Sequence, residues 1–309
     1  MSHHTSRRPR LVTARRAATL SGLAALATAG ALSSSGAMAG GDAQALHSQF
    51  SAGGQVASLA GGEGEGEGDA VIVAEGEGEG AVAASSPAAF LSGLAFMEGH
   101  MTAGLALYEE GDLAAAKTHI GHPIKEKYDA VAKGLEQAGF GNLKAQISDL
   151  AAAAEAEAEF GEIERRFAKV RETLAAVRAD FTAFQQAAGL IDLTRVAGAE
   201  YAVAVDGGQI SNLHEYQDSW GFLRVVEAEA RKMTKSDDTE VAGVGQAFIA
   251  QIEVTNAVFG DLQGKGLFRM EPSVIYGAAA RMELAAARLV QGNAEGAGSG
   301  HAEGEGESN

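Results

Sequence analysis

The residues best suited to hold a metal ion are three histidines around an expected helical hairpin, His100, His119 and His122. His100 precedes the turn expected at Gly111 by about eleven residues, and His119 follows that turn by about eight. At about 1.5 Å per residue, the two side chains would stand at similar heights on facing helices. His122 comes three residues after His119 and shares its helix face. We expect Glu126, at the start of the following helix, to complete the group.

Three imidazoles and one carboxylate suit Fe, Cu or Zn. The chain has no cysteine, so thiolate metal sites, disulfides and Fe–S clusters are excluded. A bis-histidine haem would use the same residues in a wider pocket. The alternative is that the histidines are incidental. His122 would then cap a helix, His119 would be a hydrogen-bonded surface residue and His100 a core residue.

A second, weaker group of polar residues is expected on two helices joined across Gly207-Gly208. Glu215 and Asp218 would share one helix face, and Glu200 could approach them from the other helix of the pair. His214 lies beside them in the sequence. Helical bundles that bind metals project carboxylates inward in this manner. The alternative is a hydrated helix surface, because buried carboxylates need partners.

The elements that must position these side chains are helices. Alanine, leucine, glutamate and glutamine dominate the stretch after Pro87, a composition that favours helix over strand. The pattern predicts an all-α, up-and-down bundle of about seven to nine helices with short loops. The expected helices begin at Pro87 and continue at about residues 113–120, 123–138, 143–158, 162–188, 192–206, 210–233, 238–260 and 272–291.

The two ends of the chain differ from this domain. Residues 1–39 contain five arginines, then an apolar run and Ala37-Met38-Ala39, which predicts a cleavable signal peptide and export to the periplasm or cell envelope. Residues 40–86 and 293–309 carry Gly-Glu repeats that we expect to stay unfolded, on either side of a helical domain at 87–292. The apolar run is too short for a span, so no membrane span is expected after cleavage.

Charge and motifs narrow the function further. A net charge of -17 argues against nucleic acid and favours cationic partners. No nucleophile elbow, phosphate-binding loop or dinucleotide fingerprint occurs, so we expect no enzymatic activity.

Gly99-His100, in an exported α-helical chain, is similar to the signature of imelysin-like periplasmic iron-uptake proteins. That signature is G-x-H-x-x-E, whereas here Gly99 and His100 are adjacent and the glutamate is displaced. The first hypothesis is a periplasmic protein that binds or delivers Fe, Cu or Zn, with haem as an alternative ligand. Its expected partner is an envelope transporter or receptor. The alternative is a structural or partner-binding bundle without metal.

Overall fold

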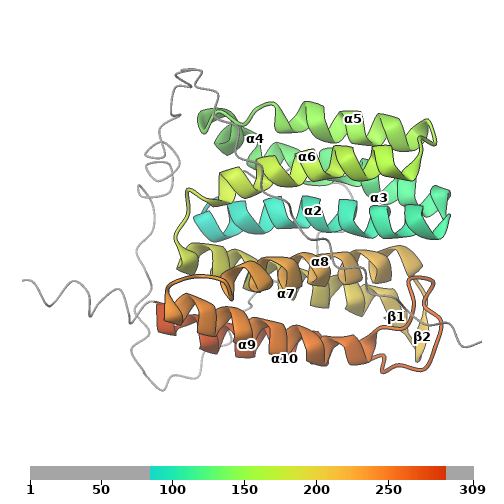
Figure 1. Ribbon diagram of the computed structural model, residues 1–309. Helices are drawn as coiled ribbons and strands as arrows, with labels where there is room; N and C mark the ends of the chain where they lie inside the picture. Colours follow the sequence, from blue (N-terminus) through green and yellow to red (C-terminus); the bar gives the residue numbers. More distant parts are fainter. Residues whose placement is uncertain (1–83, 290–309) are drawn as a thin grey trace, which may run out of the picture. The chain divides into compact units, whose positions relative to one another are not determined.

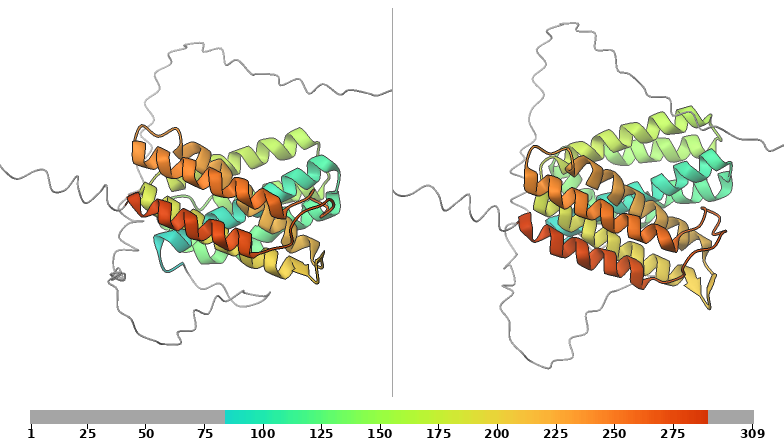
Figure 2. Two further views of the ribbon diagram at one scale, coloured as in Figure 1. Left: turned by 90° about the horizontal axis from the view of Figure 1, so that it is seen from below. Right: turned by 60° about the horizontal axis from the view of Figure 1, so that its bottom comes forward.

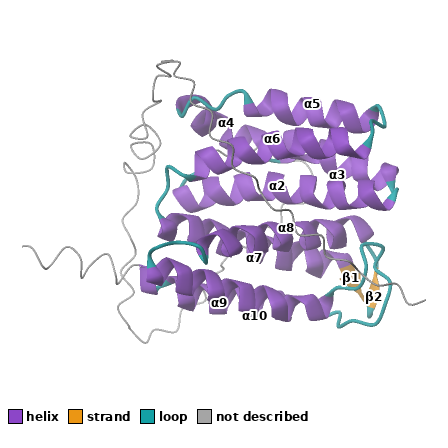
Figure 3. Cartoon of the chain, in the orientation of Figure 1, coloured by secondary structure: helices purple, strands orange, loops and turns teal. Residues whose placement is uncertain are grey.

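The computed structural model describes residues 84–289, which form an all-α bundle (Figures 1 and 3). The all-α prediction is confirmed. The predicted signal peptide, nearly all of the Gly/Glu-rich segment and the C-terminal tail lie outside the described residues. Within the described part, no helix is both long and apolar enough to cross a membrane. The elements are α2 Pro87–Glu110, α3 Leu113–Glu126, α4 Tyr128–Gln137, α5 Leu143–Glu155, α6 Phe160–Arg178, α7 Ala183–Ala204, β1 Val205–Asp206, β2 Gln209–Ile210, α8 Leu213–Met233, α9 Thr239–Thr255, η1 Asn256–Val258 and α10 Ser273–Ala286.

Helix α2 lies at the centre of the bundle. It packs against α3 and α6 on one side and against α7 and α8 on the other. Helix α5 covers α3 and α6, and α9 and α10 lie beyond α7 and α8 (Figures 1 and 2). The apolar core has two clusters that follow this division. One joins buried side chains of α2 to α6, and the other joins those of α7 to α10. The site described below lies where the two halves meet.

Glycines allow three helices to approach one another closely at that place. A Cβ atom on Gly221 of α8 would collide with the carbonyl oxygen of Gly99 on α2, and one on Gly99 would collide with the ring of Phe222. On the other side of α2, a Cβ atom on Gly104 would lie 2.6 Å from Cγ1 of Ile120 on α3. The absence of side chains at these crossings therefore draws α3, α2 and α8 together.

The local signals for helix ends explain the hairpin between α2 and α3. Ser86 caps α2 by accepting a hydrogen bond from the backbone N–H of Ala89, and Pro87 takes the first helical position. Gly111 ends α2 with φ 85°, a left-handed conformation that favours glycine. Asp112 then caps α3. This turn fixes the relative height of His100 and His119.

The predicted break at Pro123 is wrong, because α3 runs through that residue and ends at Glu126. Proline inside a helix removes a backbone hydrogen bond at a cost of about 3 kcal/mol. Pro123 and the preceding Ile120 are buried, so packing of this stretch offsets the cost. The chain breaks four residues later, at Lys127. His119, His122 and Glu126 consequently share one helix.

The predicted helix over 162–188 is also wrong, since α6 ends at Arg178 and α7 begins at Ala183. Thr182 and Gln185 form a reciprocal capping box that starts α7. Gly189, expected as a break, lies inside α7, where a Cβ atom would lie 2.7 Å from that of Leu91. This glycine serves close helix packing rather than a turn.

The turn at Gly207-Gly208 joins β1 and β2, two antiparallel strands of two residues each, with Val205 paired to Ile210. Both glycines have positive φ, 57° and 76°, as the tightest hairpin turns require. Asn212 then caps α8 by accepting hydrogen bonds from the backbone N–H groups of His214 and Glu215. The hairpin and cap together set the start of the helix that carries Asp218.

Candidate metal centre

Three helices contribute to one cluster of imidazoles and carboxylates. Helix α2 provides His100, and α8 provides Asp218 together with His214 one turn earlier. Helix α3 provides three side chains on one face. These are His119, His122 and Glu126.

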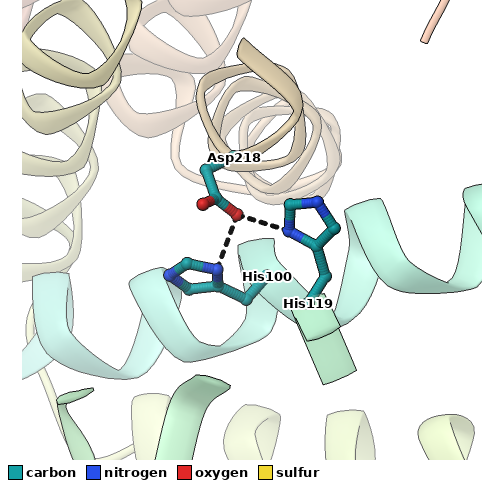
Figure 4. Close-up of side chains that lie close together, drawn as sticks. All are labelled: His100, His119 and Asp218. Atoms are coloured by element: carbon teal, nitrogen blue, oxygen red, sulfur yellow. Dashed lines mark hydrogen bonds and ion pairs between the residues drawn. The ribbon is translucent and has the colours of Figure 1, made fainter. Parts of the chain in front are cut away.

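The inner part of the cluster is buried. His100, His119 and Asp218 are 2%, 0% and 2% exposed. Nδ1 of His100 lies 2.6 Å from Oδ1 of Asp218, and Nδ1 of His119 lies 2.8 Å from the same oxygen (Figure 4). Two imidazoles from different helices thus converge on one carboxylate oxygen.

The outer part of the cluster is nearer to solvent. Nδ1 of His214 lies 3.1 Å from Oδ2 of Asp218, whereas the two inner histidines face Oδ1. Nδ1 of His122 lies 2.9 Å from Oε1 of Glu126, whose other oxygen is 3.4 Å from Nε2 of His100. The side chains of His122 and His214 are 22% and 29% exposed, against 39% for Glu126. The cluster therefore extends from the core of the bundle towards its surface.

Gln217 determines which nitrogen of His119 carries a proton. The amide nitrogen of Gln217 donates to the backbone oxygen of Leu262, which fixes the orientation of the amide group. Its oxygen lies 2.8 Å from Nε2 of His119 and must accept a hydrogen bond from that nitrogen. In the neutral ring, Nδ1 then presents a lone pair to Asp218. A metal-ligating histidine is oriented by such a partner on its second nitrogen.

His100 shows why a cation fits this arrangement. Both of its ring nitrogens are buried, and neither forms a hydrogen bond of good geometry, although Nδ1 lies close to Asp218. His214 has a buried Nε2 without a hydrogen-bond partner. Buried polar atoms normally have partners. A lone pair and a carboxylate oxygen facing each other at under 3 Å need either a proton or a metal ion between them.

The carboxylates differ in their ease of ionisation. Burial opposes ionisation of Asp218, yet the surrounding His100, His119 and His214 hold its pKa well below the ordinary value. Burial also opposes ionisation of Glu126, but His122 and His100 lower its pKa. Both carboxylates are therefore available as anions that can bind a cation.

Glu200 behaves in the opposite way. Burial, a hydrogen bond with Glu215 and the negative charges of Glu215, Asp218 and Glu126 raise its pKa to about 8. Glu200 therefore holds a proton near neutral pH and is hydrogen-bonded to Glu215 beside the cluster. The two glutamates lie beside the imidazole cluster and are not among the residues that could hold the same ion.

The two groups predicted from the sequence form a single centre. His100, His119, His122 and Glu126 come together, and His214 and Asp218 of the weaker group complete the same cluster. His119, considered above as a surface residue, is fully buried. Gln217 was not among the site residues predicted from the sequence. Its position directly before Asp218, three residues after His214, was the available signal.

The fold and the site define an all-α bundle with an intramolecular cluster of histidines and carboxylates of the kind that binds transition metals. Residues 178–253 match the family model described as the iron permease-associated 4-helix bundle domain. This segment is about a quarter of the chain, runs from the end of α6 into α9 and includes His214 and Asp218. Over it the chain is similar to that domain. No curated protein and no solved structure matches the chain.

Proposed function

We propose that this protein binds a transition metal ion, iron in preference to copper or zinc, and delivers it to a permease in the cell envelope. The observation that carries the proposal is the convergence of imidazole nitrogens from α2, α3 and α8 on the carboxylate of Asp218. Imidazole and carboxylate ligands without thiolate suit iron. The similarity to an iron permease-associated domain supports iron as the cargo and a permease as the partner.

Several features favour binding over catalysis. The inner ligands are buried, so an ion there would be held away from solvent and from potential substrates. The histidines and carboxylates form a ligand set, and no nucleophile of a known motif stands beside them. The protein would act as a carrier, and the predicted signal peptide would place it in the periplasm or cell envelope.

The geometry favours an ionic metal over haem. The carboxylate of Asp218 contacts both His100 and His119 and occupies the space that a porphyrin would need between them. The rings of His119 and His214 stack with centroids 4.2 Å apart, which leaves no room for a macrocycle between that pair. We therefore take iron itself, rather than haem, as the cargo.

The test is elemental analysis of the untagged protein purified from the periplasm, together with its absorption spectrum. We expect bound iron in the natural chain and none in the variant His100→Ala/His119→Ala/His122→Ala/His214→Ala. The matched control is His47→Ala/His301→Ala, which removes histidines outside the described residues and should retain the metal. A natural chain that holds no Fe, Cu or Zn, and whose melting temperature does not respond to these ions, would instead support the metal-free, partner-binding bundle.

A further inference from the structure

The cluster contains more ligands than one ion can use, and they divide into two sets. Three groups of side chains lie within reach of a common ion, and two of them share only Asp218. The inner set is His100, His119 and Asp218, and the outer set is His122, His214 and Asp218. Each set has two imidazoles and the same carboxylate.

The carboxylate of Asp218 serves the two sets through different oxygens. Oδ1 faces Nδ1 of His119 at 2.8 Å, whereas Oδ2 faces Nδ1 of His214 at 3.1 Å. Two ligand atoms, each about 2.1 Å from a metal and at right angles to each other, stand about 3 Å apart. Both pairs of atoms therefore have the spacing of neighbouring ligands on one ion.

The stacking of His119 on His214 sets the spacing between the two positions. Their rings are 6° from parallel with centroids 4.2 Å apart. An imidazole binds a metal in the plane of its ring, so parallel rings direct their Nδ1 lone pairs to points about one stacking distance apart. Metal ions in two-metal sites stand about 3.5–4 Å apart. The ring stack matches that separation.

Charge supports a second cation. The inner set brings only the carboxylate of Asp218, but Glu126 lies against His122 at 2.9 Å. Glu200 and Glu215 form a hydrogen-bonded pair next to these residues. Because Glu200 holds a proton near neutral pH, the carboxylates of Asp218, Glu126 and Glu215 remain to balance cations beside the four imidazoles.

From this geometry we propose that the centre binds two metal ions bridged by Asp218, the inner one held by His100 and His119 and the outer one by His122 and His214. Glu126 is the additional ligand of the outer ion, which is the ion nearer to solvent. The inference rests on the proposed metal-binding function and deepens it. The outer position is where an ion enters and leaves, and the inner position is where it is retained.

The experiment measures stoichiometry and ion–ion coupling in the whole untagged protein. The protein is loaded with Fe²⁺ without oxygen, passed over a desalting column and analysed for iron. A parallel sample loaded with Cu²⁺ is examined by electron paramagnetic resonance, where two ions about 4 Å apart give a coupled signal. The variants are His214→Ala and His119→Gln, with His47→Ala/His301→Ala as the matched control.

We expect two ions per chain and a coupled spectrum in the natural protein and in the control. His214→Ala should retain one ion with the spectrum of an isolated Cu²⁺. Because His214 is partly exposed, its variant should fold even if a change at the buried His119 does not. One ion in the natural chain, or two ions without coupling, would overturn the bridged pair while leaving the metal-binding function intact. No retained ion at all would overturn both.

Discussion

At the scale of single residues, Asp218 is the organising group of the centre. Its two oxygens face histidines from three helices, although the carboxylate is only 2% exposed. Taking such a charge out of water costs several kcal/mol unless cations or hydrogen bonds compensate it. The histidine nitrogens that face the carboxylate provide this compensation, and a metal ion bound between them would replace any proton that lies there. Metal binding and proton release are therefore linked at this carboxylate.

The first prediction concerns Gln217, which orients His119 without reaching the ion. Gln217→Leu removes the acceptor for Nε2 of His119, so Nδ1 is no longer fixed as the ligand atom. Loss of such an orienting partner lowers metal affinity by about 10–100-fold. Titration calorimetry with Fe²⁺ measures the change. The control Gln263→Leu, whose side chain bonds Asp112, should keep natural affinity. Equal affinities in both variants would mean that Gln217 does not orient His119.

The second prediction concerns Glu200, whose pKa is raised to about 8 mainly by burial and then by Glu215. In the unfolded chain the pKa of this carboxyl group is 4.5. Between pH 4.5 and about pH 8, the folded chain therefore holds a proton that the unfolded chain has lost, and the free energy of unfolding falls as pH rises through this range. Glu200→Gln removes this loss. The metal-free variant should melt several degrees higher than the natural protein at pH 8 and at about the same temperature at pH 4.5.

Thermal melts at the two pH values test the predicted direction of the change in melting temperature. The exposed Glu271, changed to Gln, is the control and should leave the pH dependence unaltered. A Glu200→Gln variant that is less stable at pH 8 than the natural chain would show that the carboxylate is ionised and paired in the folded protein, contrary to our assignment.

At the scale of helices, the centre depends on how closely α2 and α8 cross. Gly221 lies three residues after Asp218, against the backbone of Gly99, which precedes His100. Gly221→Ala would force the helices apart. Overpacking of this kind costs about 1–3 kcal/mol, which outweighs the gain of about 1 kcal/mol from alanine's helix propensity. We expect net destabilisation and weaker metal binding, because His100 and Asp218 would separate.

The matched control is Gly243→Ala in α9, where a Cβ atom meets nothing within 4 Å. The same substitution should there stabilise the protein by up to about 1 kcal/mol and leave metal affinity unchanged. Urea unfolding and calorimetry of both variants give the comparison. If Gly221→Ala also stabilised the protein, the crossing would have room that the present packing does not show.

Local sequence rules predicted the hairpin of α2 and α3, because Gly111 and Asp112 are strong end signals whose effect does not depend on the rest of the fold. They failed at Pro123 and Gly189, where burial and helix packing outweigh the local preference. They also selected histidines and carboxylates that the fold brings together, but placed them in two groups. Joining the groups requires the crossing of α2 with α8, which connects residues more than a hundred positions apart and leaves no local pattern.

At the scale of the whole described domain, the centre joins the two halves of the core. His100, His119 and His122 belong to α2 and α3, within the half formed by α2 to α6, whereas His214 and Asp218 belong to α8 in the other half. A metal ion bound between them would cross-link the halves. A ligand at 100 times its dissociation constant stabilises a protein by about 2.7 kcal/mol. In a domain of this size, that corresponds to a rise in melting temperature of about 5–10 °C.

We therefore expect Fe²⁺ to raise the melting temperature of the natural protein by that amount, with the rise growing as more metal is added, since stabilisation follows mass action. Hydrogen exchange should slow most in α2, α3 and α8, because separating the halves would require release of the ion. Asp218→Asn, which removes the charge shared by both halves, should show neither effect. A temperature rise of the same size in that variant, or protection confined to one half, would mean that the ion binds elsewhere and does not tie the two halves together.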